Sequence, residues 1–447
     1  MGSQEFSPSR LSRPDLEIQF RQAVPLINSA SKMEDANSQS GLAVPEESGI
    51  ARNNRFLLGT LAAGHLVNDW VAGTIWLVAP AIAASMGLGP AEVGLIIAIN
   101  GIAAGFTYVP AGIIADRTRN SGLLMLISFW WVAIGYFLST LVPGFWLITL
   151  FLAIGNMGDA FWHPVATGVL VKTMPKRRAQ VLGIHAMGGS VGAEILAPIS
   201  IGVLLTYFDW QSSLQIITIP AFLMGLLFIV MGPRITSVSR QSIRKEKLAQ
   251  VMQVWLTHRG LMMIGMMVLY NMSLFAILSM TPLTLQQRYE MSVFNSSVLF
   301  ASMLVIGTLF QPFIGKLSDM VGRSQPIIMT LLFSTVFAAG AAWFEAFIPF
   351  MIALICAVSL LTAVRPIILA TAVELSEQSE STTLGVVFSV LDGVGALGAL
   401  AAGLAGEIDL TLAFFMAAVF SIFSIVLYLA SLASSKGKKC QVAFDDR

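Results

Sequence analysis

The side chains best suited to chemistry in this sequence are two histidine–aspartate pairs. His65 and Asp69 are four residues apart, and so are Asp159 and His163. On an α-helix this spacing places both members of a pair on one face, where an imidazole and a carboxylate can share a hydrogen bond or pass a proton. Both pairs lie in strongly apolar stretches. The sequence therefore predicts two buried sites that can exchange protons, or else two polar contacts that only hold helices together.

Four more ionisable side chains interrupt apolar stretches, and they are further candidates for function. They are His185, Glu194, Arg365 and Asp392. We expect Glu194 to exchange protons together with the two histidine–aspartate pairs. The guanidinium of Arg365 can bind an anionic solute through two parallel hydrogen bonds. It can equally form a structural pair with Asp392 or Glu194, and both readings stay open at this point.

The composition places these groups in a membrane. Hydrophobic residues make up 56% of the chain and charged residues only 11%, which is far from the usage of soluble proteins. A helix that crosses a bilayer needs about 20 consecutive apolar residues, and such stretches follow one another from residue 56 to residue 434. The sequence therefore predicts an all-α membrane protein with twelve transmembrane helices.

Polar segments divide the predicted spans into two bundles of six. We expect a disordered tail at 1–55, a bundle at 56–232, a basic linker at 233–259, a second bundle at 260–434 and a tail at 435–447. All but two of the 26 lysines and arginines fall on one predicted side of the membrane. Because cytoplasmic loops carry the excess of basic residues, both termini and the linker are predicted to be cytoplasmic.

An internal repeat relates the two bundles. Three proline pairs share a separation of 202 residues, namely Pro80 with Pro282, Pro110 with Pro312, and Pro164 with Pro366. At the same separation His163 corresponds to Arg365, and Asp69 corresponds to Asn271. Six spans are an even number, so both halves have the same orientation in the membrane. This parallel repeat is typical of transporters whose halves rock against each other.

A glycine followed four residues later by an aspartate recurs where the second and eighth predicted spans end. With the basic residues that follow, the two copies comprise Gly112, Asp116, Arg117, Arg119, Gly315, Asp319 and Arg323. They resemble the cytoplasmic signature of the major facilitator superfamily. The resemblance implies that these residues gate the cytoplasmic mouth. A carboxylate and arginines at a helix end can latch neighbouring helices, or can simply cap the interface.

Two further segments resemble the fosmidomycin resistance branch of that superfamily, which exports antibiotics. They are the stretch from Gly64 to Asp69 and the stretch from Phe161 to Pro164. Val165 stands where that branch has an acidic residue. We expect Asn68, Trp70, Trp162, Asn271, Arg365 and Asp392 to bind the solute.

These observations predict a secondary transporter that exports a small organic solute or drug in exchange for protons. The alternatives are proton-coupled import of an organic anion and, less favoured, a membrane scaffold or receptor that does not transport. No ATP-binding or hydrolase motif occurs, and Cys356 and Cys440 have no metal-ligand spacing. We therefore expect no enzymatic activity, no cofactor and no metal. We also expect no nucleic-acid partner, a monomer, and a bacterial inner-membrane location.

Overall fold

The computed structural model describes residues 45–174, 177–235, 253–376 and 385–445. Twelve helices within these ranges are long and apolar enough to cross a membrane, and no strand occurs among them. The predicted twelve-helix fold is confirmed. The predicted 1–55 tail lies mostly outside the described residues, as does most of the predicted linker at 233–259.

The first half contains six spans, of which the first and the fifth are interrupted. Its elements are α2 (Pro45–Gly73), α3 (Ile75–Ser85), α4 (Pro90–Arg117), α5 (Ser121–Ser139), α6 (Phe145–Thr173), α7 (Arg178–Ser190), the π-helical turn η2 (Val191–Leu196), α8 (Ala197–Tyr207), α9 (Trp210–Met231) and the short 3-10 turn η3 (Gly232–Arg234).

The second half also has six spans, and its first span, α11, is continuous. Its elements are α11 (His258–Gln287), α12 (Val293–Val321), α13 (Ser324–Trp343), α14 (Phe347–Ser376), the π-helical turn η4 (Ser389–Val394), α16 (Leu397–Gly406) and α17 (Leu410–Asp445). The last candidate membrane span is Leu410–Ser434, and α17 continues beyond it to Asp445.

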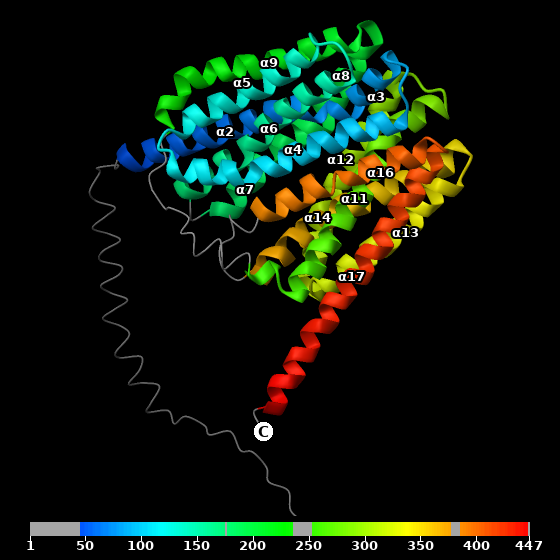
Figure 1. Ribbon diagram of the computed structural model, residues 1–447. Coiled ribbons are helices and arrows are strands. Elements are labelled where there is room, and N and C mark those ends of the chain that lie inside the picture. Colours follow the sequence, from blue (N-terminus) through cyan, green and yellow to red (C-terminus); the bar gives the residue numbers. More distant parts are fainter. Residues whose placement is uncertain (1–44, 175–176, 236–252, 377–384, 446–447) are drawn as a thin grey trace, which may run out of the picture. The chain divides into compact units, whose positions relative to one another are not determined.

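Residues 57–447 form one compact unit, in which each half has its own helix packing. In the first half, α6 packs against α4 and α5, and α5 packs against α9. In the second half, α17 packs against α11 and α13, and α14 packs against α12 and α13. Figure 1 shows the helices of each half gathered in this way. Short breaks between spans make successive helices run antiparallel, and most of these contacts join spans that are not successive in the chain.

The halves meet through glycines that line one end of α4. A Cβ atom added to Gly94 would meet the backbone of Ala399, and one added to Gly105 would meet the backbone of Gly393. Small residues allow two helix backbones to approach this closely in a membrane. Farther along α4, a Cβ atom on Gly112 would meet only Pro164 of its own half. The two halves are therefore in contact along the first part of α4, toward its Pro90 end.

Candidate functional site

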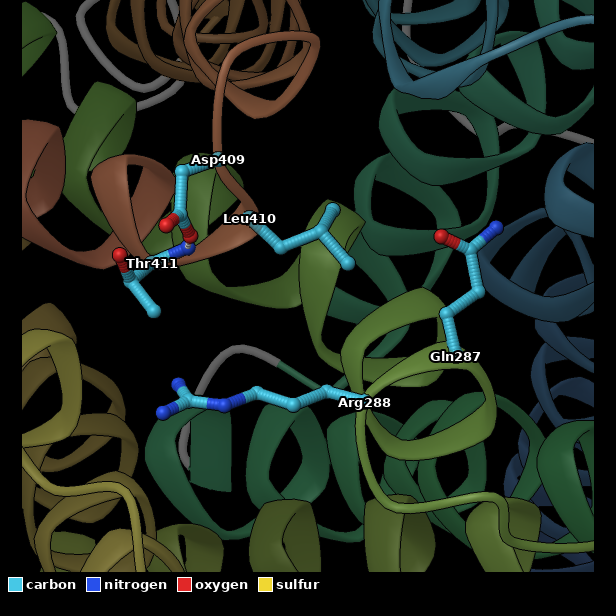
Figure 2. A pocket seen from close by; sticks show the side chains of 5 residues that line it. All are labelled: Gln287, Arg288, Asp409, Leu410 and Thr411. Carbon is cyan, nitrogen blue, oxygen red and sulfur yellow. Dashed lines mark hydrogen bonds between the residues drawn. The ribbon is translucent and has the colours of Figure 1, made fainter.

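A shallow pocket lies on the surface between the end of α11 and the start of α17 (Figure 2). Gln287, Arg288, Asp409, Leu410 and Thr411 line it. The Thr411 backbone N–H donates a 2.8 Å hydrogen bond to Asp409, and this bond lowers the pKa of the Asp409 carboxyl. Asp409 thus caps a helix start. None of the predicted site residues lines this pocket, so the candidate site lies elsewhere.

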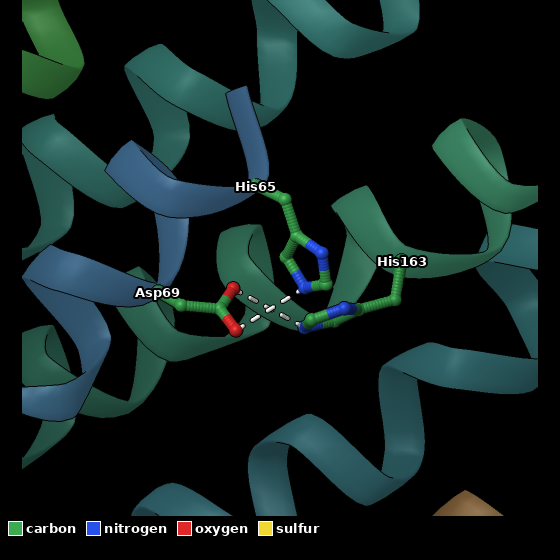
Figure 3. Close-up of side chains that lie close together, drawn as sticks. All are labelled: His65, Asp69 and His163. Carbon is green, nitrogen blue, oxygen red and sulfur yellow. Dashed lines mark ion pairs between the residues drawn. The ribbon is translucent and has the colours of Figure 1, made fainter. Parts of the chain in front are cut away.

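The two predicted histidine–aspartate pairs form a single cluster between α2 and α6. His65 Nε2 lies 3.2 Å from Asp69 Oδ2, and His163 Nε2 lies 3.6 Å from Asp159 Oδ2. The link between the pairs is a 3.9 Å approach of His163 Nε2 to the other Asp69 oxygen. Figure 3 shows both imidazoles pointing at the Asp69 carboxylate. We call these four side chains the His–Asp cluster.

Asn68 belongs to the framework of the His–Asp cluster. This side chain is fully buried, and its amide nitrogen donates to the carboxylate of Asp159. The same nitrogen lies 3.4 Å from Asp69 Oδ1. A single amide therefore reaches both carboxylates and keeps them as hydrogen-bond acceptors. In this conformation Asn68 positions acidic groups, although the sequence favoured contact with a solute.

The hydrogen bonds of His65 determine which of its nitrogens carries a proton. Nδ1 lies 2.8 Å from the backbone oxygen of His185, and a carbonyl can only accept, so Nδ1 must be the donor. In a neutral imidazole this leaves a lone pair on Nε2, which faces Asp69 Oδ2 at 3.2 Å. Two lone pairs this close repel each other unless a cation lies between them. A proton or another positive ion at this position therefore stabilises the His–Asp cluster.

Helix α7, which supplies the His185 carbonyl, and the π-helical turn η2 that follows it lie unusually close to α2. Cβ atoms added to Gly188 and Gly192 would meet the backbones of Ala62 and Leu66. The His185 ring, which is 1% exposed, stacks on the His65 ring with centroids 4.2 Å apart. His185 was singled out by the sequence only as a buried ionisable residue. In the structure the buried His185 ring packs directly against the His65 ring of the His–Asp cluster.

The predicted tryptophans differ in their surroundings. Trp162 is fully buried and packs against Phe129, with ring centroids 4.8 Å apart, so in this conformation it does not face a cavity. Trp70 is partly buried and donates a 2.8 Å hydrogen bond to the Ser200 hydroxyl. Both side chains therefore help to fix helices around the cluster. Solute binding by either one remains a prediction.

A second polar group joins the two halves beside the His–Asp cluster. Arg365 on α14 donates a 2.9 Å hydrogen bond to Asp392 on η4. The other oxygen of that carboxylate accepts from the Tyr108 hydroxyl of α4 at 3.2 Å. The Tyr108 ring in turn lies 6.1 Å from the His163 ring, measured between centroids. Tyr108, which sequence reasoning missed, thus connects the polar groups of the two halves.

Glu194 does not touch the His–Asp cluster in this structure. Its carboxylate, on the π-helical turn η2, accepts a 2.6 Å hydrogen bond from Thr308 of α12 in the opposite half. Asn271, predicted to bind solute, is fully buried and donates to the backbone oxygen of Leu391. Glu194 thus lies at a second contact between the halves, while Asn271 supports η4.

At the ends of α4 and α12 the gating candidates make ion pairs with the fourth span of their own half. Asp116 pairs with Lys172 of α6 at 3.0 Å. Arg323 pairs with Asp319 at 2.6 Å and with Glu374 of α14 at 3.1 Å, and these bonds raise the pKa of Arg323. The remaining candidates are Gly112, Arg117, Arg119 and Gly315, and both arginines are exposed. Lys172 and Glu374 were not predicted, because partners in another helix cannot be identified from local spacing.

Gly189 provides the first test of this geometry. A Cβ atom added there would lie 2.6 Å from His65 Nε2 and 2.8 Å from Asp69 Oδ2, both shorter than real Cβ contacts. We therefore expect Gly189→Ala to displace the cluster and to lower the initial transport rate at least about tenfold, or about 1.4 kcal/mol. Gly183→Ala is the matched control, since nothing lies within 4 Å of its added Cβ. Equal rates in both variants would contradict the importance of this contact.

Comparison with known proteins agrees with this architecture. A variant of the nucleoside transporter NupG superposes with a TM-score of 0.70 at 16% identity, over 84% of this chain and 99% of that one. A bacterial homologue of the human lysosomal transporter Spinster, inward-facing and unoccupied, gives 0.67 at 18% identity over 85% and 96%. No curated protein sequence matches the chain.

A family model covers the region that contains the His–Asp cluster and the Arg365–Asp392 pair. It describes the Major Facilitator Superfamily and matches residues 61–399, which include the His–Asp cluster, Tyr108, Arg365 and Asp392. The fold, the internal repeat and this match agree that the protein is a transporter and not an enzyme. The chain belongs to the major facilitator superfamily.

Proposed function

We propose that this protein exports a small organic solute from the cytoplasm in exchange for protons. The observation that carries the proposal is the lone pair of His65 Nε2 facing an Asp69 oxygen at 3.2 Å. A cation stabilises that geometry, and a proton is the cation always present on both sides of a membrane. A buried site that binds a proton can couple its gain and loss to the movement of a solute.

Proton exchange at the cluster has a direct route to the interface between the halves. Tyr108 hydrogen-bonds to Asp392 of the second half and lies beside His163 of the first. A change of charge at His163 therefore acts on a side chain that bridges the halves. A solute in the same place meets the protonatable His163, the Tyr108 hydroxyl and the Arg365–Asp392 pair. Competition between proton and solute for this region is the proposed coupling.

The proposed topology supports export as the direction of transport. The distribution of basic residues favours both termini in the cytoplasm. In that topology the Arg117 end of α4 faces the cytoplasm and the Pro90 end faces outward. The halves touch at the Pro90 end. Such a conformation opens to the cytoplasm, as the inward-facing Spinster homologue does by its description. It is ready to take up a cytoplasmic solute, and the bacterial inner membrane is the proposed location.

The resemblance to the fosmidomycin resistance branch supports export of an antibiotic-like compound. It rests on the segment that contains His65 and Asp69 and on the segment that contains Trp162 and His163. The solved structures share less than a fifth of their residues with this chain and inform the fold alone. The proposed substrate class is therefore a small organic solute or drug, and a monomer is the proposed transporting unit.

Import of an organic anion is the second candidate function, and Arg365 is the observation that favours it. The guanidinium is near the interface between the halves and its side chain remains 30% exposed. An anion could compete for it with Asp392. Because Asp392 already neutralises this charge at 2.9 Å, export remains the better-supported direction.

Reconstituted vesicles and whole cells together test the proposal. Cells of a drug-sensitive host that express the protein should survive higher doses of at least one toxic compound, with phosphonate antibiotics included in the panel. Vesicles that contain purified protein should then release protons when that compound is taken up. Protection without proton movement would refute the coupling. Accumulation of an anion driven by inward protons would replace export with the second candidate.

A further inference from the structure

We propose that His65, Asp69 and His163 form a binding site for a divalent transition-metal ion, with Zn²⁺ as the representative ion. One ligand atom from each residue lies within 4.8 Å of the other two. The ligands come from α2 and α6, and all three side chains are largely shielded, with exposures of 10%, 18% and 25%. The sequence predicted no metal, because only the fold brings His163 to the first pair.

The spacing of the ligand atoms is close to what such an ion needs. Zinc bonds to imidazole nitrogen and carboxylate oxygen are about 2.0–2.2 Å long, which in tetrahedral geometry separates ligand atoms by about 3.3 Å. His65 Nε2 and Asp69 Oδ2 are 3.2 Å apart, and His163 Nε2 is 3.9 Å from the other Asp69 oxygen. All three ligand atoms lie within 4.8 Å of one another, so His163 must move closer to the other two ligands when an ion binds.

The surroundings of His65 match those of a metal ligand. A histidine that binds a metal usually donates its second ring N–H to a carbonyl or carboxylate, which fixes the tautomer and aims the free lone pair at the ion. His65 Nδ1 makes this bond to the His185 carbonyl at 2.8 Å. Asn68, which donates to the Asp159 carboxylate and lies 3.4 Å from Asp69 Oδ1, holds the acidic groups in place.

Charge and ligand type point to a transition metal. The Asp69 and Asp159 carboxylates both approach His163 Nε2, at 3.9 and 3.6 Å, so a second carboxyl group lies beside the proposed ligands. Two imidazoles favour Zn²⁺, Co²⁺ or Ni²⁺, whereas Mg²⁺ and Ca²⁺ prefer oxygen ligands. The ion takes the place between His65 and Asp69 that a proton otherwise fills.

Calorimetry on the purified full-length protein in detergent tests the site. Titration with Zn²⁺ should reveal one ion per chain, whereas Mg²⁺ should give no binding heat. His65→Ala and His163→Ala should each weaken Zn²⁺ binding at least about tenfold, or about 1.4 kcal/mol. His258→Ala is the matched control, because His258 is exposed at the start of α11 and should leave the affinity unchanged.

A measurement on the unmodified protein guards against variants that fail to fold. X-ray absorption of the Zn²⁺-loaded protein should show two imidazoles around the ion, and Co²⁺ should give the strong visible bands of a four-coordinate centre. Unchanged affinity in both histidine variants would overturn the proposal, and so would a zinc shell without imidazole. These readouts do not depend on transport, so zinc binding in a protein that moves no protons would leave this inference standing and refute the proton coupling.

Discussion

Replacing Asp69 with Asn should abolish proton-coupled transport while the protein still folds. The side chain keeps its shape but can no longer accept a proton, and its amide can donate to the lone pair of His65 Nε2, which now lies 3.2 Å from Asp69 Oδ2. The cluster is then stable without a cation at this position. We expect solute-driven proton movement in vesicles to fall at least about tenfold, which corresponds to about 1.4 kcal/mol.

The control for this variant is the same substitution at an exposed aspartate. Asp209 caps α9 by accepting a 2.7 Å hydrogen bond from the Ser212 backbone N–H, which lowers the pKa of its carboxyl. Asn caps helices about as well as Asp, so Asp209→Asn removes one negative charge and leaves the helix intact. Its transport should equal that of the parent protein. Normal, proton-dependent transport by Asp69→Asn would exclude Asp69 as the coupling residue.

Breaking the Arg365–Asp392 pair should have the largest effect on stability. Arg365→Met leaves the Asp392 carboxylate without its 2.9 Å partner inside the bilayer region. Removal of one member of a buried ion pair costs about 3–5 kcal/mol. We expect the lower end of this range, since the Arg365 side chain is 30% exposed and water screens the remaining charge. Thermal unfolding of the purified variant measures the loss.

A double variant separates charge imbalance from lost packing. Arg365→Met combined with Asp392→Leu removes both charges and should recover most of the stability that the single change loses. No recovery would show that Arg365 stabilises the protein through contacts other than Asp392. Arg365→Lys keeps the charge but lacks the planar fork, so loss of anion binding at full stability in this variant would favour the import alternative.

The sequence predicted the fold well because the bilayer imposes long apolar helices with short breaks. The spans and the repeat follow directly from that constraint. It also identified the members of the His–Asp cluster, since four-residue spacing on a helix fixes a shared face. It could not show that α2 and α6 turn these faces toward each other, because helix rotation depends on packing between distant segments.

Other parts of the candidate site gave no local signal. Tyr108 looks like any aromatic residue in an apolar span, and only the contact with Asp392 distinguishes it. Thr308 likewise is distinguished only by its hydrogen bond to Glu194 in the other half. The π-helical turns depend on tertiary contacts, which the hydrophobic pattern does not encode. Asn68 contacts both carboxylates and Trp162 packs against Phe129 in this conformation, and solute binding by either residue remains a prediction.

Two carboxylates on π-helical turns each contact the opposite half of the chain. Glu194 occupies the fourth position of η2 and accepts from a hydroxyl on α12, while Asp392 occupies the fourth position of η4 and accepts from a hydroxyl on α4. The 202-residue repeat does not relate these two contacts, since Glu194 and Asp392 are 198 residues apart and Tyr108 and Thr308 are 200 residues apart. Movement of one half against the other must therefore break two unlike contacts, a carboxylate–tyrosine bond beside Arg365 and a carboxylate–threonine bond.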